Sequence, residues 1–403
     1  MAPPSDSSGR SRVVVESFPP PADLVFRTSV AGFVCPAVAG APPVPPAPPP
    51  PALPLALLFT SWPDFADAFR DGPAWRAGTW LPDELLWASV QGFFGNGGSR
   101  CWVVLYDPAA TGNPLAALDI GVGALAEIDD VDLVCAPSLL GQEAPLALQQ
   151  QLIRSSEQRR DDWFLILDAP PPAASQDLAA WLAALRAAPS SRPEDAAVYQ
   201  PWLLPGGDVE PPPGGASRPV PPSGHVAGIF ARTDRKIGVH KAPANEAIEG
   251  IVDVAAEVDD VAGANSILAF PGRGIRVWGA RTLAIPASNV DANAQVSVRR
   301  LILTLDRWLV RALDWTVFET NDARTWVRIH RELNRRLTGL FDQGALQGST
   351  PDEAFFVKCD DENNPADVRA AGKLQVDIGV APAVPNEFIK IRLVRSAEGI
   401  TVA

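Results

Sequence analysis

A serine, two histidines and an aspartate stand close together in one stretch, and these are the residue types of a serine hydrolase. Ser223 and His225 would be the nucleophile and the base, with Asp234 or His240 as a further member of the site. Ser223 and His225 are too close in sequence for an unstrained pair, however, and no GxSxG turn occurs in the chain. The stretch therefore does not predict an active site.

Glycine-rich stretches that could bind phosphate are equally weak. Residues 121–126 match the GxGxxA form of a dinucleotide fingerprint, but residues 115–120 make a poor strand in front of it. Residues 272–274 (GRG) lack a third small residue, and no Walker lysine motif occurs. HxxxH, CxxC and EF-hand spacings are also missing from the sequence. We expect neither a cofactor nor a metal site.

The composition indicates a large soluble protein. The chain has 403 residues, of which 47% are hydrophobic, and a net charge of −13. Such a length supports two or three domains without disulfides or metals, and the acidic balance argues against a nucleic acid partner. The N-terminus lacks the features of a signal peptide, and the longest apolar run, near residues 52–59, is too short to span a bilayer. We expect assembly in the cytoplasm and no membrane partner.

The absence of CxxC pairs predicts four buried thiols in a reducing compartment, at Cys35, Cys101, Cys135 and Cys359.

The middle of the chain alternates strand-like and helix-like segments. Residues 131–135 and 164–167 are short apolar runs, as in strands that are buried on both faces. Residues 145–158 and 177–187 read as helices, the second with Trp181, Leu182 and Leu185 facing inward. This alternation predicts an α/β domain with a largely parallel sheet.

The last third predicts two amphipathic helices. Ser297 can cap a helix that runs to about Phe318, and Asn321 or Asp322 can cap the next, which Gly344 ends. The first apolar face contains Val298, Leu301, Ile302, Leu305, Trp308, Leu309 and Ala312, and the second contains Trp326, Ile329, Leu333, Leu337 and Leu340. Strands are expected at residues 355–359, 374–380 and 388–395, which gives a small α+β domain.

Two proline-rich stretches carry no packed core. Residues 41–54 contain nine prolines and should form a stiff polyproline segment, and residues 205–222 read as a surface loop. The first stretch could be a ligand for an aromatic groove, but a loop or spacer is the simpler interpretation.

Seven motifs in a fixed order point to a family. PPSGHVAGIFARTD (221–234), continued by GVHKAPAN (238–245), combines a rigid Pro-Pro entry, small residues that let backbones approach closely, and a polar cluster. The six others are TSWPDF (60–65), GFFGNGGSRCWVV (92–104), FLILDAP (164–170), YQPWL (199–203), NSILAFPGRGIRVWGARTL (265–283) and RRLILTLDRWL (299–309). Over roughly residues 12–395, the chain resembles the contractile tail sheath proteins of phage tails, tailocins and related contractile injection systems.

The resemblance implies a central α/β domain of subtilisin-like topology, followed by a smaller C-terminal α+β sheath domain with strand arms at both termini. We expect an N-terminal arm at 1–25, the central domain at 26–285, the C-terminal domain at 286–384 and a C-terminal strand arm at 385–403. In the family such arms pair with neighbouring subunits, whereas pairing within the same chain is the alternative. The exchanged residues would be Val13, Val14, Val15, Phe388, Ile389, Ile391 and Leu393.

The implied function is structural and not enzymatic. Copies would polymerise helically around an inner tube, together with baseplate and tail terminator proteins, and contract without nucleotide hydrolysis to drive the tube through a target envelope. The particle would be released from the cell or form part of a virion. The alternatives are an α/β hydrolase-like enzyme, which would remain a small oligomer, and a sheath-like adaptor that caps the tail.

Two further sets of residues are candidates for contacts. Arg324, Arg328, Arg331 and Arg335 repeat at intervals of four, three and four and form one basic ridge, which either faces the tube or is simply solvated. In the signature, Arg232 and Asp234 would pair or cap backbone groups, and His240 and Asn245, like His225, would have structural roles as partners of buried polar atoms. Arg273 and Arg276 would either form intersubunit salt bridges or cap local carbonyls.

Overall fold

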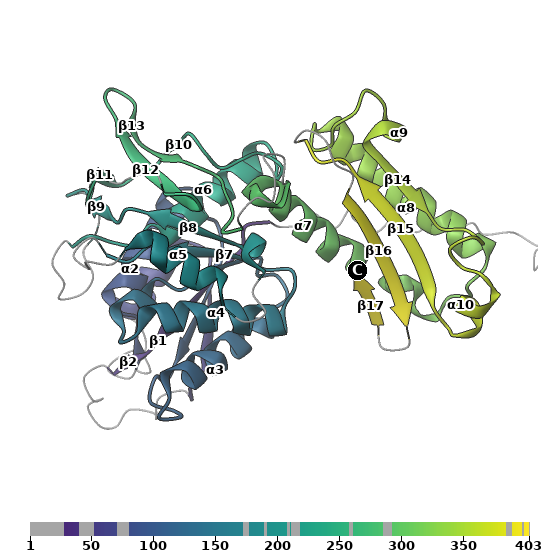
Figure 1. Ribbon diagram of the computed structural model, residues 1–403. Helices are drawn as coiled ribbons and strands as arrows, with labels where there is room; N and C mark the ends of the chain where they lie inside the picture. The colour runs from purple at the N-terminus through teal and green to yellow at the C-terminus, as the bar shows by residue number, and fades with distance from the viewer. Residues whose placement is uncertain are drawn as a thin grey trace, which may run out of the picture.

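The computed structural model describes residues 28–39, 52–70, 80–171, 177–188, 192–207, 210, 218–257, 261–284, 292–383, 389–396 and 399–402. These residues form two lobes, with a single long helix, α7 (Val296–Ala312), crossing from one to the other (Figure 1). Among the described residues, no helix is both long and apolar enough to cross a bilayer.

The first lobe is built on a nine-stranded sheet. Its six central strands, from β5 to β12, are parallel, and antiparallel strands complete both edges. In spatial order the strands are β10 (Glu246–Ala247), β13 (Gly274–Trp278), β12 (Ala264–Phe270), β8 (Ala196–Gln200), β7 (Phe164–Asp168), β6 (Leu133–Cys135), β1 (Ala31–Pro36), β5 (Cys101–Tyr106) and β3 (Leu55–Phe59). The largely parallel sheet that the alternating segments predict is confirmed.

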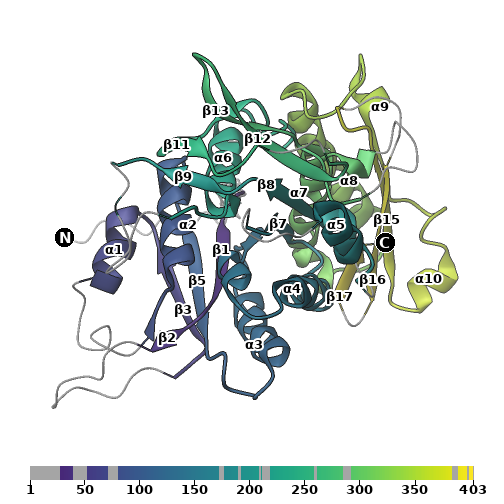
Figure 2. The same cartoon turned by 60° about the vertical axis from the view of Figure 1, so that its left-hand side comes forward.

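Helices cover both faces of this sheet, because successive strand residues point to opposite sides. Phe164 and Ile166 of β7 belong to one apolar core, whereas Leu165 and Leu167 belong to the other. The first core is completed by α1 (Trp62–Arg70), α2 (Glu84–Gly95) and α6 (Ser223–Lys236), and the second by α3 (Pro114–Ala126), α4 (Pro145–Arg159) and α5 (Leu178–Arg186) (Figure 2). Trp181, Leu182 and Leu185 face inward as expected.

Short elements connect these layers. Two small antiparallel pairs flank the main sheet, β2 (Val38–Ala39) with β4 (Trp80–Leu81) and β9 (Leu203–Pro205) with β11 (Ile251–Val254). Single 3₁₀ turns lie at η1 (Pro137–Gly141), η2 (Pro193–Asp195), η3 (Ala292–Ala294) and η4 (Asp314–Phe318). All four cysteines are buried thiols, as expected.

The second lobe is the predicted α+β unit. An antiparallel sheet packs one face against α7 and α8 (Ala323–Asp342) around a third apolar core. The sheet contains β14 (Phe355–Lys358), β15 (Leu374–Val380), β16 (Ile389–Ser396) and β17 (Gly399–Val402), and the short helices are α9 (Pro351–Ala354) and α10 (Ala366–Ala370).

The boundaries of the two helices differ partly from expectation. The first helix begins at Val296 after Gln295, so Ser297 lies inside its first turn and is not the cap; it ends at Ala312, and η4 replaces its last predicted turn. Asp322 does cap α8, because its carboxylate accepts from the backbone N–H groups of Arg324 and Thr325. The predicted apolar face of α7 is buried, as is the stripe of α8 except for the half-buried Leu340.

Candidate functional site

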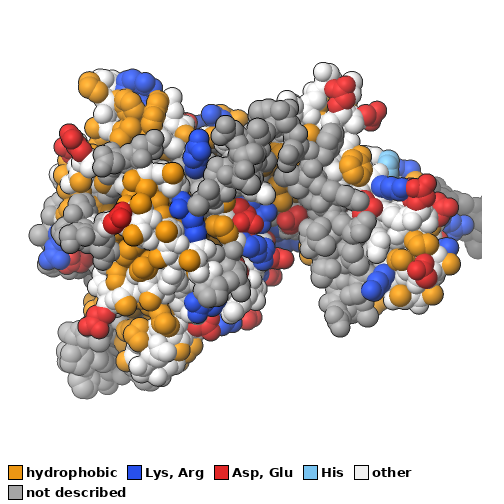
Figure 3. Space-filling model, in the orientation of Figure 1, with side chains coloured by type: hydrophobic (Ala, Val, Ile, Leu, Met, Phe, Trp, Pro, Cys, Tyr) orange, Lys and Arg blue, Asp and Glu red, His pale blue; other side chains and the backbone are white. Residues whose placement is uncertain are grey.

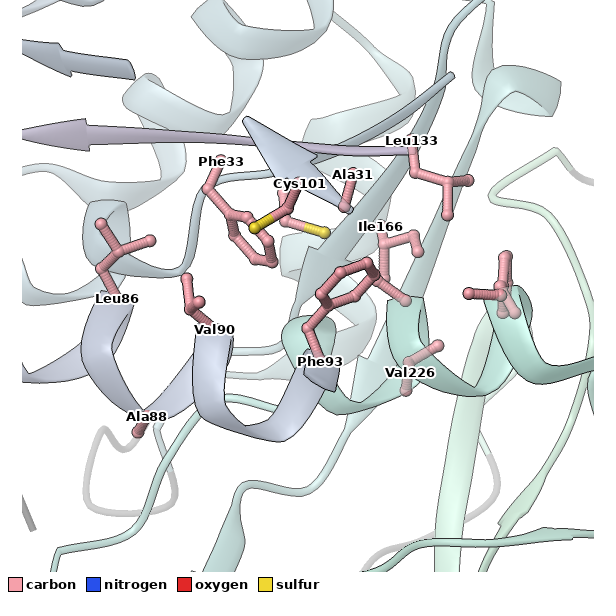
Figure 4. Packing of buried hydrophobic residues seen from close by; sticks show 14 of the residues in the cluster. Ala31, Phe33, Leu86, Ala88, Val90, Phe93, Cys101, Leu133, Ile166 and Val226 are labelled. Atoms are coloured by element: carbon pink, nitrogen blue, oxygen red, sulfur yellow. The ribbon is translucent and has the colours of Figure 1, made fainter. Parts of the chain in front are cut away.

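The signature stretch at residues 221–234 forms helix α6, which enters through Pro222 and lies almost wholly buried beneath the sheet. Its Val226 points toward the sheet beside Phe93 of α2, and Phe33 and Cys101 of the strands face them (Figure 4). The stretch is therefore a core element.

Glycines let α6 and α2 touch through their backbones. A Cβ on Gly224 would overlap the Ser89 carbonyl of α2, and one on Gly228 would overlap the Phe93 carbonyl. In the other direction, Gly92 of α2 leaves room for the His225 ring. The close backbone approach that the small residues predict is confirmed, and it explains why no larger side chain fits at these positions.

The structure does not assemble a hydrolase triad. Ser223 and Asp234 are eleven positions apart on one helix, which is about 16 Å along its axis at 1.5 Å per residue. His225 is buried, and burial lowers the pKa of its imidazole to about 4. The GxGxxA match lies inside helix α3, where no phosphate-binding turn exists. Within the described ranges, no group of three or more His, Cys, Asp or Glu side chains is placed to hold a metal ion.

The far end of α6 holds a buried ion pair with helix α7. Arg300 donates two hydrogen bonds to the Asp234 carboxylate, at 2.6 and 3.0 Å, and its guanidinium lies 4.7 Å from the centre of the Phe230 ring. Ser29, just before β1, donates to Asp234 at 2.6 Å and accepts from Arg300 at 3.0 Å. The side chains of Arg300 and Asp234 are only 3% and 2% exposed, so both charges depend on this pairing.

Further arginines of α7 bind aspartates that precede the parallel strands. Arg307 donates to Asp162 at 2.7 Å, just ahead of β7, and Arg299 binds Asp195, which stands directly before β8. Asp132, before β6, lies 3.9 Å from Arg300. The amino ends of parallel strands share one sheet edge, so one helix can bind all of them. We call this set the arginine junction: Arg299, Arg300 and Arg307 with Asp132, Asp162, Asp195, Asp234 and Ser29.

Burial and the neighbouring arginines have opposite effects on the pKa values of the aspartates in the arginine junction. Burial raises the pKa of Asp132 to about 6, although Arg307 and Arg300 lower it. The carboxylate accepts from the backbone N–H groups of Ser29 and Val30 at 2.7 and 2.6 Å, so it fixes the chain entering β1. Burial also raises the pKa of Asp162, but hydrogen bonds and charge from Arg160 and Arg307 bring it below its ordinary value. The ion pairs therefore join α7 to several strand starts at once.

Asp306 on α7 is one group that should make stability depend on pH. It is half-buried, and its Oδ1 accepts no hydrogen bond from the residues that the structure describes. Burial raises the pKa of its carboxyl from 3.8 to about 7. The folded chain therefore holds this proton when the unfolded chain has lost it, and the free energy of unfolding falls as pH rises from about 4 to 7.

Asp306→Asn should consequently leave stability almost unchanged at pH 4 and raise the free energy of unfolding by about 2 kcal/mol at pH 8. Urea unfolding of the full chain at both pH values measures this. Asp177→Ala, a loss of the α5 cap, serves as a control whose effect should be destabilising at pH 8. Equal effects of Asp306→Asn at the two pH values would contradict the prediction.

The other signature residues make local contacts. Arg232 and Asp234 do not pair with each other: Arg232 donates to the Ala247 carbonyl at 2.6 Å and lies 3.5 Å from Glu246. Arg276 donates to the Asn245 carbonyl at 2.6 Å, and Arg273 to the Asn245 side chain at 3.0 Å. Of the two expected roles, an intersubunit salt bridge or a cap for local carbonyls, Arg276 has the second within the single chain.

Asn245 and His240 differ in how far they fulfil their expected role. Asn245 is exposed, but its backbone N–H donates to the carbonyl of the buried Val277 at 2.7 Å. Its backbone is left-handed, with φ 59°. His240 is half-buried, and this burial lowers the pKa of its imidazole. Gly272 and Gly274, at φ 69° and 75°, form a tight turn before β13.

The basic ridge lies on the outer side of α8. Arg324, Arg328, Arg331 and Arg335 are all exposed, although Arg328 also stacks 3.7 Å from the centre of the Trp315 ring and lies 3.8 Å from Glu319. The exposure is compatible with both interpretations of the ridge.

The residues expected to exchange between subunits are only partly visible. Val13, Val14, Val15 and Phe388 lie outside the described residues. Ile389, Ile391 and Leu393 belong to β16, which in the single chain pairs antiparallel with β15, for example Ile391 with Ile378. Pairing between chains stays a prediction.

Sequence reasoning missed the arginine junction. Arg300 and Arg307 stand seven positions apart on a helix predicted from its apolar face alone, and an aspartate stands one or two positions before each of the strands β6, β7 and β8. The repeated aspartate before a strand was the available signal. The arginine partner of each aspartate could not be assigned from the sequence, because paired residues are far apart in the chain. Arg300 and Asp234 are 66 positions apart, and Arg307 and Asp162 are 145 apart.

Comparison with known proteins identifies the family of both lobes. The model for the phage tail sheath protein central domain matches residues 110–283, and that for the phage tail sheath C-terminal domain matches residues 291–395. The chain is 29% identical over 191 residues to the tail sheath protein of Vibrio phage KVP40, covering 45% of this chain and 27% of that protein. It therefore spans only about a quarter of the length of this curated relative.

Solved structures match over almost the whole length. A chain in the cryo-EM structure of the anti-feeding prophage (AFP) baseplate is 27% identical with a TM-score of 0.66, covering 95% of this chain and 98% of that one. A chain of the PVC sheath complex, an extracellular contractile injection system in its contracted state, is 25% identical with a TM-score of 0.67, covering 96% and 97%. With two domain models that together match most of its length, the chain belongs to the phage tail sheath family.

Proposed function

We propose that this chain is the subunit of a contractile sheath that polymerises helically around an inner tube and drives the tube through a target envelope. The observation that carries the proposal is the match, over 96% of this chain and 97% of the other, to a sheath chain of a contractile injection system. Its partners would be further copies of itself, a tube protein, a baseplate and a tail terminator. Assembly in the cytoplasm and release as an extracellular particle or virion complete the proposal.

The arginine junction suits such a subunit mechanically. A sheath subunit has to transmit force between its lobes while its contacts to neighbours change. Four buried aspartates bound by three arginines of one helix resist separation of the lobes, because pulling them apart would leave charges unpaired at low dielectric. The subunit would then move as one body, and the strand arms at both termini would act as hinges.

The proposal also includes properties that the resemblance to sheath proteins implies. We include the subtilisin-like topology of the central lobe, arms that pair between subunits, and contraction without nucleotide hydrolysis or any other enzymatic step. A nucleic acid partner is not part of it, since the net charge is −13 and acidic and basic side chains are mixed on the face shown in Figure 3.

Electron microscopy of the full chain, expressed alone and then with its tube protein, tests the proposal. We expect hollow striated cylinders, with the tube required if it templates the extended state. Small monodisperse particles under both conditions would refute self-assembly, and hydrolase and adaptor assays would then be the next step.

The basic ridge is proposed to face the tube, in weak and salt-sensitive contact that can be released on contraction. Arg324→Glu combined with Arg335→Glu should reduce tube co-assembly about tenfold at low salt, because two exposed contacts become repulsive. Co-sedimentation with the tube protein measures this, and Lys241→Glu on the other lobe is the matched control. Unchanged co-assembly of the double variant would show that the ridge is simply solvated.

A further inference from the structure

Ser29, just before β1, has a strained backbone in the interior of the molecule. Its φ is 61°, a left-handed conformation that costs free energy because the Cβ approaches the following carbonyl oxygen. The structure describes two other non-glycine residues with such a φ, Ala144 and Asn245, and both are exposed, whereas Ser29 is only 4% exposed. Strain of this kind persists only where the surroundings fix the conformation, and it is frequent at functional sites.

Hydrogen bonds from several segments hold Ser29 in this conformation. The Asp132 carboxylate accepts from two consecutive backbone N–H groups, that of Ser29 at 2.7 Å and that of Val30 at 2.6 Å. The Val30 carbonyl accepts in turn from the backbone N–H of Asp132 at 3.1 Å. The Ser29 hydroxyl donates to Asp234 and accepts from Arg300. One short piece of chain is therefore bound to two aspartates, which lie 3.9 and 2.6 Å from Arg300.

This binding takes place where the predicted N-terminal arm meets the central lobe. The arm is expected at residues 1–25, and Ser29 lies within a few residues of its end. Strand β1 begins two residues later, at Ala31, and pairs with β5 and β6 inside the sheet. Arg300 belongs to α7, which crosses to the second lobe (Figure 1). A pull on the arm would therefore reach Ser29 before it reached β1, and it would pass from Ser29 into α7.

We infer that Ser29 anchors the N-terminal arm and passes tension on the arm into α7 and the second lobe. The inference rests on the proposed sheath function, because only an arm that pairs with a neighbouring subunit carries tension. The bonds of the hydroxyl run to charged groups, which makes them stronger than bonds between neutral groups. Their partners come from α6 and α7 and not from the strands that pair with β1. The hinge of the arm consequently lies before Thr28.

Pulling on single molecules of the full chain in an optical trap tests this route. In the arm geometry, one handle is attached to the N-terminus and the other to Arg335→Cys on α8. In the lobe geometry, the handles are attached to Lys241→Cys and Arg335→Cys, so that the two lobes are pulled without the arm. Both engineered positions are exposed, whereas the four native thiols are buried and do not compete for the handles. The lifetime of the folded state at constant force is measured in each geometry.

Ser29→Gly removes the hydroxyl and leaves a residue that adopts the left-handed conformation without strain. It should shorten the lifetime about tenfold in the arm geometry, where two bonds to charged groups are lost, and less than about twofold in the lobe geometry. Asn245→Gly, the matched change at an exposed left-handed residue, should alter neither lifetime.

Two results would overturn the inference. Equal shortening in the two geometries would make Ser29 one more structural contact of the arginine junction, and an unchanged lifetime in the arm geometry would show that tension does not pass through it. The proposed function is tested separately by electron microscopy. If the pulling results are as expected but the wild-type chain forms no cylinders with or without the tube, the anchor is confirmed in the single chain and its role in a sheath is refuted.

Discussion

Gly224→Ala in α6 is expected to destabilise the central lobe by about 3 kcal/mol or more, as is Gly228→Ala. The added methyl group would overlap the carbonyl of Ser89 or Phe93 in α2, and these are backbone atoms that cannot turn aside as a side chain could. The two helices would have to separate along their whole contact, which would loosen the buried residues of the core they share. Urea unfolding of the full chain, followed by far-UV circular dichroism, measures the change.

Gly339→Ala is the matched control for both variants. Gly339 lies in the interior of α8, and no heavy atom lies within 4 Å of a Cβ built there. Alanine should therefore stabilise the helix by roughly 0.5–1 kcal/mol, because it restricts the unfolded chain more than glycine does. If Gly224→Ala behaved like Gly339→Ala, the close backbone contact between α2 and α6 could not be what the signature glycines provide.

Arg300→Met should destabilise the chain by about 3–5 kcal/mol. The substitution keeps much of the side-chain volume but leaves Asp234 buried beside Ser29 without its cation, and it removes the arginine nearest to Asp132. Lysine should not restore stability, because a single ammonium cannot reproduce the paired hydrogen bonds to Asp234 together with the contact to Phe230. Calorimetric unfolding of the full chain gives the magnitude.

A double-mutant cycle isolates the ion pair. Asp234→Asn on the Arg300→Met background removes the unpaired charge, so the double variant should be more stable than Arg300→Met alone. Arg331→Met, at an exposed arginine of α8, should change stability by less than about 0.5 kcal/mol. Similar losses for Arg300→Met and Arg331→Met would mean that the arginine junction contributes no more than a surface charge.

These two predictions concern different requirements of a sheath subunit. The glycine contact stabilises the core of the central lobe, whereas the arginine junction connects that core to the second lobe through α7. An Arg300→Met chain that still folds but forms irregular cylinders would therefore separate folding from the transmission of force between the lobes.

The local elements could be predicted from the sequence. The runs at residues 131–135 and 164–167 became β6 and β7, and Asp177 caps α5 as the residue before its apolar stripe. Such signals lie within one or two turns of chain, where apolar periodicity and capping side chains act directly. A local capping signal can still mislead. Ser297 has the residue type of a helix cap, yet the residue with an extended backbone at the start of the helix is Gln295, and the helix begins one residue before the serine.

The sequence by itself determined the layered α/β lobe, the amphipathic helices of the second lobe and, through its ordered motifs, the family. Only the tertiary structure decided what the charged residues do. Ser29, Asp132, Asp234 and Arg300 come from four separate segments and meet only because parallel strands bring their starting points to one edge, along which α7 lies. Periodicity records which face of an element is buried, whereas the partner of a buried charge depends on distances across the folded chain.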